Sequence, residues 1–305
     1  MGTIDLSVKI GTLLLANPVM VASGTFGYGE EYAALMDCNK LGAVVTKGIS
    51  LNPSAGNLPP RIVETPSGML NAIGLQNVGL ERFVAEKMPF LRSIKAAVVV
   101  NFYGASIDEY VALAERLDSV EGIDALEANI SCPNIKAGGI AFGTSADMAG
   151  RVTAAIREVT GLPLIVKLTP NVTDITVIAR SAAAAGADAL SLTNTFTGMV
   201  VDTDTRRPAL ANISGGLSGP AIRPLALYNV WQVAGAVDIP VIGIGGITDT
   251  QDALQFLIAG AQAVQIGTAL FVNPRSAQEI AAGLAAYVSR QGHGSIGDII
   301  GSLET

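Results

Sequence analysis

A repeat of short apolar runs, separated by segments with helical periodicity, constrains this chain more than any other feature. The runs are rich in valine, isoleucine and alanine, and they lie at residues 19–22, 43–46, 96–100, 125–129, 164–167, 189–193, 240–244 and 263–266. Nearly continuous apolar strands are needed in a parallel sheet that is buried on both faces. The sequence therefore predicts eight parallel strands.

The segments between these strands have the apolar spacing of surface helices. We expect helices at 30–40, 80–93, 107–119, 145–160, 173–185, 221–236 and 250–259. Two of them are followed by Gly186-Ala187 and Gly260-Ala261, and a glycine at this place fits a helix C-terminal cap. Alternating strands and helices over about 250 residues predict an α/β fold, the (β/α)8 TIM barrel.

Two further segments lie outside the repeat. Residues 4–15 contain Gly11-Thr12 and are predicted to form a short N-terminal hairpin that closes the bottom of the barrel. Residues 49–79, after the second strand, are rich in glycine and proline and form an insert that is too long for an ordinary connection. No linker resembles a domain boundary, so residues 1–305 are predicted to form a single domain.

Composition and charge exclude several classes of protein. Half of the 305 residues are apolar and the net charge is −7, which disfavours nucleic acid and anionic membranes as partners. No secretory signal and no run of about twenty apolar residues is visible. We therefore expect a soluble, cytoplasmic protein. The two cysteines, Cys38 and Cys132, are too few to hold an iron–sulfur cluster, and no metal site is predicted.

Polar residues follow the predicted strands at the ends where barrel enzymes carry their active sites. A single lysine at a strand end is more commonly a solvated charge. Two lysines and three asparagines at matching positions instead indicate a polar ring around a pocket. The residues at these positions are Ser23, Lys47, Asn101, Asn129, Lys167, Asn194 and Thr195.

Glycine-rich loops follow the last two strands, at Gly245-Gly246 and Gly267-Thr268. Glycine lets backbone amides approach an anion closely, and the start of a helix favours negative charge. The two loops together predict a phosphate site, beside further flexible backbone at residues 215–219.

Residues 126–143 end the fourth strand and place Cys132 before Pro133, which terminates the strand. An isolated cysteine at a strand end is most often buried core. Gly138, Gly139 and Gly143 follow, however, and predict a loop that opens and closes over a ligand. Because the only histidine, His293, lies beyond the last strand, Cys132 is the candidate catalytic base.

Five motifs together resemble class 1 dihydroorotate dehydrogenase, subfamily 1B. They are Thr46-Lys47-Gly48, the NAIGLQN stretch at 71–77, the NISCPN stretch at 129–134, residues 215–220, and Gly245-Gly246 with Gly267-Thr268. The resemblance runs from about residue 6 to residue 274. It implies an FMN-dependent oxidation of dihydroorotate to orotate in pyrimidine (UMP) biosynthesis, with Cys132 as the catalytic residue.

The resemblance also implies which residues bind the ligands. Flavin contacts fall on Ser23, Lys47, Gly48, Asn101, Asn129, Lys167, Thr193, Gly219, Gly245, Gly246, Gly267 and Thr268. Substrate contacts fall on Lys47, Asn71, Ala72, Ile73, Gly74, Leu75, Asn129, Asn194 and Thr195. Thr193 stands where a more apolar residue is expected, so its contact is predicted to run through the backbone.

Subfamily 1B further implies a second subunit that carries FAD and a [2Fe–2S] cluster and delivers electrons to NAD, most simply in a heterotetramer built on a homodimer core. Three alternatives remain at this point. A related flavin barrel, either fumarate-using class 1A or dihydropyrimidine dehydrogenase-like, shares the cysteine loop. A phosphate-binding aldolase barrel would use Lys167 as a Schiff-base lysine, and a silent binding barrel would share only the fold.

Overall fold

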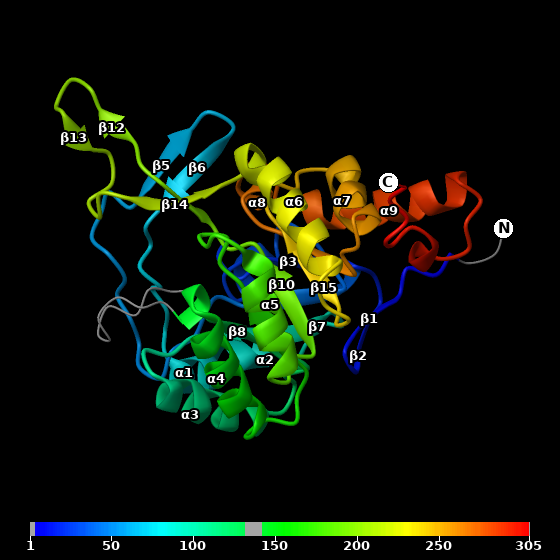
Figure 1. The fold of residues 1–305 in the computed structure, drawn as a ribbon, viewed down its shortest axis with the longest axis horizontal. Coiled ribbons are helices and arrows are strands. Elements are labelled where there is room, and N and C mark those ends of the chain that lie inside the picture. The colour runs from blue at the N-terminus through cyan, green and yellow to red at the C-terminus, as the bar shows by residue number, and fades with distance from the viewer. Residues whose placement is uncertain (1–3, 132–141, 305) are drawn as a thin grey trace.

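The computed structural model describes residues 4–131 and 142–304. Its centre is a closed barrel of eight parallel strands (Figure 1). The strands follow one another around the barrel in chain order, and the last pairs with the first. They are β3 (Val19–Val21), β4 (Ala43–Val45), β7 (Ala97–Phe102), β8 (Ala125–Asn129), β9 (Leu164–Lys167), β10 (Ala189–Leu192), β15 (Val241–Ile244) and β16 (Ala263–Ile266). The predicted (β/α)8 barrel is confirmed.

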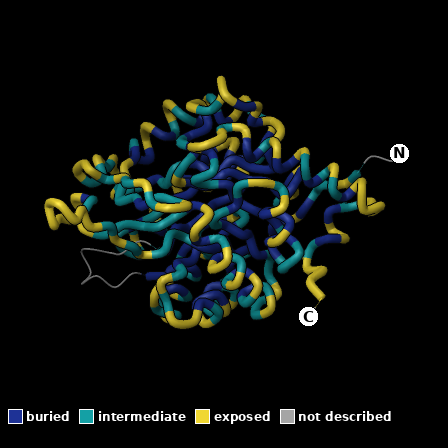
Figure 2. The backbone as a smooth tube through the Cα atoms, turned by 90° about the horizontal axis from the view of Figure 1, so that it is seen from above, coloured by how far each residue is buried: buried dark blue, intermediate teal, exposed yellow. Residues whose placement is uncertain are grey.

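Helices cover the outside of the barrel, while the strands form its buried interior (Figure 2). The longer helices are α3 (Ile107–Asp118), α4 (Ala146–Arg157), α5 (Ile175–Ala184), α6 (Arg223–Ala234), α7 (Thr250–Ile258) and α9 (Ser276–Arg290). Short helical segments are α8 (Ala269–Val272), η4 (Phe142–Thr144), η5 (Pro220–Ile222) and η6 (Ile296–Asp298). Ser106 and Ser145 begin α3 and α4 by accepting a backbone N–H of the first turn. Within the described residues, none of the helices combines the length and apolar character needed to cross a bilayer.

The helix predicted at 30–40 is wrong. Two 3₁₀ turns, η1 (Glu30–Tyr32) and η2 (Cys38–Lys40), replace it. Asp37 is extended between them, and its carboxylate accepts the N–H of Asn39. This local hydrogen bond starts a new turn in place of a continuing helix, as short acidic side chains commonly do.

The helix predicted at 80–93 exists but is interrupted. It consists of α1 (Leu80–Arg82), the π-helical turn η3 (Phe83–Lys87) and α2 (Met88–Leu91). Pro89 lacks the N–H that an α-helix would donate to Ala85, and its ring crowds that carbonyl. The widened turn before Pro89 follows from this conflict.

The predicted N-terminal hairpin is confirmed as β1 (Val8–Ile10) paired with β2 (Leu13–Leu15). Gly11, in its turn, has a φ of +59°, and a Cβ added there would lie 2.9 Å from Cβ of Asp188. Because Asp188 directly precedes β10, the hairpin lies at the amino ends of the barrel strands.

A second, antiparallel sheet stands beside the barrel (Figure 1). Its strands run in the order β11 (Phe196–Gly198), β14 (Gly215–Ser218), β6 (Gly68–Asn71) and β5 (Ile62–Thr65), and a small hairpin, β12 (Val201–Asp202) with β13 (Arg207–Pro208), lies next to it. The sheet joins the predicted insert after the second barrel strand to the connection after the sixth. Asn71 is thereby paired with Gly216.

Candidate active site

The strand-end polar residues lie together at the carboxyl end of the barrel. Lys167, the last residue of β9, pairs in register with Asn129, the last residue of β8. The Lys167 ammonium lies 3.3 Å from the hydroxyl of Ser23, which follows β3, and donates a hydrogen bond to it. All three side chains are buried. The barrel therefore holds a cation and polar groups at its mouth, as predicted.

A buried carboxylate below this ring was not predicted. Oε1 of Glu127 accepts a 2.7 Å hydrogen bond from Asn101 and lies 3.8 Å from the Lys167 ammonium. Its other oxygen accepts hydrogen bonds from Ser191 at 2.9 Å and Gln265 at 2.7 Å. Glu127 is fully buried, so these donors replace the water that the charge has lost. The feature of the sequence that could have indicated this site is Glu127 itself, a charged residue within an otherwise apolar predicted strand.

Asn129, at the end of β8, and Asn194, just after β10, form a second polar cluster across the intervening strand β9. The Asn194 amide donates to the Ser131 hydroxyl at 2.7 Å and to Oδ1 of Asn129 at 3.4 Å. Ser131, which we did not predict as a site residue, also donates to Oδ1 of Asn129 at 2.6 Å. Thr195 lies against Gly216, because a Cβ on that glycine would approach the Thr195 hydroxyl to 2.0 Å. The Asn71 amide donates to the Gly216 carbonyl at 3.4 Å and extends the cluster to the second sheet.

The NAIGLQN stretch is held in a strained conformation by one of its own side chains and by Tyr103, which follows β7. Gly74 and Leu75 have positive φ values of 73° and 57°, and positive φ is unfavourable for leucine. The Leu75 carbonyl accepts hydrogen bonds from the Asn77 amide at 2.9 Å and the Tyr103 hydroxyl at 3.0 Å. Ala72 donates its backbone N–H to the carbonyl of Arg61. The Ile73 carbonyl accepts the backbone N–H of Asn57, so Ala72 and Ile73 are both held by backbone pairing within the insert.

Lys47 follows β4, and its backbone N–H donates to the carbonyl of Gly27 at 2.7 Å. Burial lowers the pKa of the Lys47 ammonium, and the positive charge of Arg61 lowers it further. None of the ion pairs among the described residues involves Lys47. A Cβ on the next residue, Gly48, would approach Oδ1 of Asn101 to 2.7 Å, so this glycine permits close packing at the barrel mouth.

The predicted phosphate loops meet at the other side of the barrel mouth. Gly219, Gly245 and Gly246 have φ values of 96°, 135° and 72°, which favour glycine. A Cβ on Gly246 would lie 2.8 Å from the Gly219 carbonyl oxygen, which shows that the two loops touch. Thr268 donates its hydroxyl to Ser218 at 2.8 Å, and Gly267 directly precedes it. The loops after β14, β15 and β16 thus form one glycine-lined cradle.

Thr193 joins the cradle to the polar ring. Its backbone N–H and its hydroxyl both donate to the carbonyl of Ile244, at 2.9 Å and 3.4 Å. Both donors of Thr193 therefore have a partner within the protein, and its predicted backbone contact with a ligand stays a prediction.

Cys132 lies outside the described residues, as do Gly138 and Gly139, whereas the preceding residue, Ser131, belongs to the asparagine cluster. Cys38 is buried in η2, and burial raises the pKa of its thiol, so it is not an activated nucleophile.

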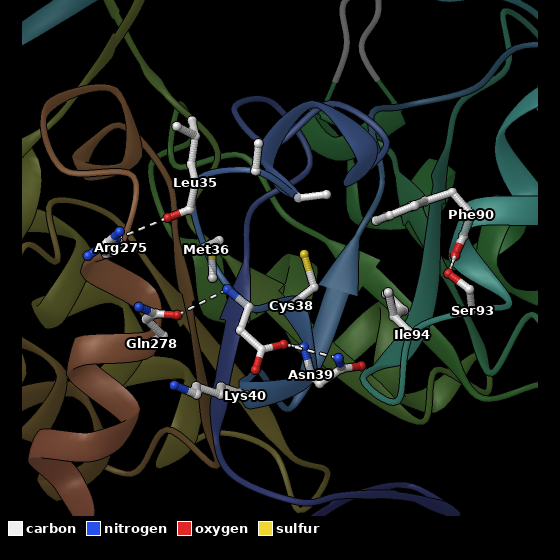
Figure 3. Close-up of a pocket in the computed structure, with 13 residues that line it drawn as sticks. Leu35, Met36, Cys38, Asn39, Lys40, Phe90, Ser93, Ile94, Arg275 and Gln278 are labelled. Carbon is white, nitrogen blue, oxygen red and sulfur yellow. Dashed lines mark hydrogen bonds between the residues drawn. The ribbon is translucent and has the colours of Figure 1, made fainter.

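A cavity of about 570 Å³ opens on the side of the barrel between the 3₁₀ turns, α2 and α9 (Figure 3). The cavity lies beside residues 30–40, where a helix was predicted after the first barrel strand and two 3₁₀ turns are found instead. Arg275 donates to the Leu35 carbonyl there, and Gln278 accepts from the N–H of Asp37. None of the predicted site residues lines this cavity. We therefore assign the chemistry to the barrel mouth, where the polar groups converge.

Comparison with known proteins shows the family of this chain. Residues 5–288 match the family model described as dihydroorotate dehydrogenase. The chain belongs to the dihydroorotate dehydrogenase family. It is 60% identical to the "Dihydroorotate dehydrogenase B (NAD(+)), catalytic subunit" of Trichlorobacter lovleyi over 98% of both chains, and 57% identical to the subunit of that name from Geotalea uraniireducens over all of both chains. The crystal structure of a dihydroorotate dehydrogenase from Eimeria tenella in complex with ferulenol covers 98% of this chain and 88% of its own, with a TM-score of 0.80 and 23% identity.

Dihydroorotate dehydrogenases depend on a flavin, and the barrel mouth fits one. The glycines of the cradle have no side chains of their own, and glycine lets backbone amides approach a phosphate closely. Lys167 is buried with its ammonium at the barrel mouth, where a cation can face a flavin ring. The carboxylate of Glu127, below Lys167, accepts hydrogen bonds from donors of the protein.

Proposed function

We propose that this chain oxidises (S)-dihydroorotate to orotate with FMN as its cofactor and Cys132 as the base. The observation that carries the proposal is the joint position of Lys167, the asparagine cluster and the glycine cradle at one barrel mouth. These groups suit two ligands, one with a ring and a phosphate and the other with a ring, an imide and a carboxylate. Family membership supports the same reaction.

The oxidation removes two hydrogens from adjacent carbons. One leaves as a proton, taken by the Cys132 thiolate, the other leaves as a hydride, and the carbon–carbon bond becomes double. When bound, FMN supplies the hydride acceptor, since no protein side chain takes a hydride from carbon. A free cysteine thiol has a pKa near 8.5, and a thiol can act as a base near neutral pH where its surroundings stabilise the thiolate.

The remaining residues bind and orient the ligands. Lys47 serves as a point charge for the substrate carboxylate, and its unfavourable burial in the free protein is relieved when the anion arrives. Asn71, Asn129 and Asn194 offer donors and acceptors at fixed angles, as a pyrimidine imide requires. Lys167 offsets negative charge that develops on the flavin side during the reaction. The backbone of residues 72–75 supplies the wall next to Asn71.

We also propose that the electrons leave through a second subunit that carries FAD and a [2Fe–2S] cluster and reduces NAD. The curated relatives are named as NAD(+)-linked catalytic subunits, which supports a partner. Cys38, the one cysteine among the described residues, is buried, so a cluster has no ligand set there. A heterotetramer of two catalytic and two electron-transfer subunits in the cytoplasm is the simplest assembly.

The choice of electron acceptor tests this proposal. Purified alone and loaded with FMN, the chain is expected to pass electrons from dihydroorotate to artificial dyes but scarcely to NAD. Adding the electron-transfer subunit should restore NAD reduction. Efficient NAD reduction by the single chain would contradict the partner, and rapid turnover with fumarate would indicate the class 1A reaction.

A further inference from the structure

Asp252 in α7 forms a buried polar junction next to the glycine cradle, away from the residues that contact substrate. One of its oxygens accepts hydrogen bonds from the backbone N–H of Thr248 at 3.0 Å and from the Thr248 hydroxyl at 2.6 Å. The other oxygen pairs with the guanidinium of Arg223. The Asp252 side chain is only 4% exposed. Since Arg223 is the first residue of α6, one carboxylate ties the starts of two helices together.

The cradle backbone lies directly on this junction. A Cβ on Gly246 would lie 2.7 Å from Cβ of Arg223 and 2.8 Å from its backbone nitrogen. A Cβ on Gly245 would lie 2.6 Å from Cβ of Ala226, one turn further along α6. Residues 245–248 are therefore enclosed between the first turn of α6 and the carboxylate of Asp252. The position of their backbone amides depends on how firmly α6 and α7 are joined.

Charge gives the junction a second effect. A phosphate in the cradle is an anion, and the buried carboxylate of Asp252 belongs to the same loop region. Arg223 neutralises that carboxylate, and without Arg223 the loop would present an uncompensated negative charge to the phosphate. An unphosphorylated flavin has no anion at this end and would not be repelled.

We propose that the Arg223–Asp252 ion pair is a positioning device for the cradle that makes the site select phosphorylated flavin over riboflavin. This inference rests on the proposed FMN site and deepens it. Neither residue was predicted from the sequence, and neither is required to contact substrate.

The test compares flavin binding by the full-length chain, measured by quenching of flavin fluorescence, for FMN and for riboflavin. The wild-type chain is expected to prefer FMN. In Arg223→Met the dissociation constant for FMN should rise roughly tenfold or more, the size expected for loss of a charge-assisted interaction, while that for riboflavin changes little. Arg223→Lys keeps the charge and should recover part of the preference. A wild-type ratio in folded Arg223→Met would overturn the proposal.

A second variant covers the case in which Arg223→Met does not fold because the buried carboxylate of Asp252 has lost its partner. Arg223→Met with Asp252→Asn removes both charges, so the repulsion is gone and only the tie between α6 and α7 is lost. The preference of this double variant for FMN over riboflavin should lie between the preference of the wild type and that of Arg223→Met. If Arg223→Met does not fold, the preference of the double variant should still be weaker than that of the wild type. An unchanged preference in the double variant would overturn the positioning role.

Arg157 and Asp188 provide the matched control, because they form an Arg–Asp pair with 2.7 Å between Nη1 and Oδ2 at the other end of the barrel. Arg157→Met should lower stability without changing the ratio of the two dissociation constants. An equal change of the ratio in this control would attribute the effect to general loosening and overturn the proposal. A wild-type chain that binds FMN and riboflavin equally would contradict the proposed phosphate site itself.

Discussion

The two ends of the barrel both carry charged side chains, but only one end leaves them for a ligand. At the amino end, Arg157 pairs with Asp188 and also donates to the carbonyl of Leu162 at 2.9 Å. Asp118 accepts hydrogen bonds from the Thr160 hydroxyl at 2.6 Å and from the N–H of Gly161 at 2.8 Å, and these bonds hold its pKa below the usual range. The charges there stabilise the fold because each has partners within the chain.

At the carboxyl end, Lys47 is half-buried, has no ion-pair partner among the described residues, and has a lowered pKa. Such an arrangement costs stability in the free protein and is common at sites that bind an anion. The difference teaches that a half-buried charge without an ion-pair partner among the described residues, such as that of Lys47, indicates a site for an anionic ligand more strongly than a charge that is paired within the chain.

The largest expected effect concerns Cys132 at the carboxyl end. Cys132→Ser should bind FMN normally but turn over roughly 10²–10⁴-fold more slowly near neutral pH, because a hydroxyl is far harder to deprotonate than a thiol. Its activity should rise with pH in steady-state assays with dihydroorotate. Cys38→Ala is the control and should retain turnover, since its thiol is buried away from the barrel mouth. Full activity of the serine variant near neutral pH would remove Cys132 as the base.

The two lysines at the carboxyl end should separate flavin effects from substrate effects. Lys167→Ala is expected to slow flavin reduction by roughly 10²-fold, as loss of one preorganised stabilising group does, with little change in substrate affinity. Lys47→Ala should weaken both flavin retention and substrate affinity. Stopped-flow reduction at several dihydroorotate concentrations distinguishes the two. A borohydride-trappable substrate adduct that disappears in Lys167→Ala would instead support an aldolase.

The amino end should show the opposite behaviour. Arg157→Met removes the partner of Asp188 and should lower the free energy of unfolding by about 1–3 kcal/mol, the usual cost of leaving a part-buried polar group unsatisfied. Denaturant titration measures this loss, and kcat/KM measured on the same samples should stay at the wild-type value. A fall in kcat/KM without a fall in stability would contradict the proposal that charges at the amino end serve the fold and not the reaction.

The smallest expected effect is the pH dependence that Lys47 causes in the ligand-free chain. Its folded pKa lies below the ordinary value of 10.5, so between the two values the unfolded chain binds more protons than the folded chain. The free energy of unfolding therefore rises as the pH increases from the folded pKa of Lys47 to its unfolded pKa. Below this range, the full cost of burying the charged ammonium is present. Lys47→Met should be more stable than wild type near neutral pH, with a difference that shrinks toward alkaline pH. Thermal unfolding at several pH values checks this, and a wild type that is more stable near neutral pH would contradict it.

The sequence predicted those parts that depend on local pattern. Eight buried strands follow from apolar runs, and Lys167 or Asn129 could be placed because parallel strands bring their carboxyl ends together. The helix at 30–40 failed because one side chain, that of Asp37, competes with the helix for a backbone N–H. The second sheet was missed because it pairs Asn71 with Gly216, which are far apart in the sequence. Neither segment alone indicates that the other is its partner. Glu127 and the Arg223–Asp252 pair acquire meaning only from partners on other strands and helices.

The most direct test of the account is anaerobic mixing of the FMN-loaded chain with dihydroorotate while the flavin absorbance is recorded. The account predicts that the visible flavin bands bleach in a single turnover and that orotate appears in an equal amount. FMN-loaded protein that does not bleach with dihydroorotate would contradict the assignment of substrate to the barrel mouth.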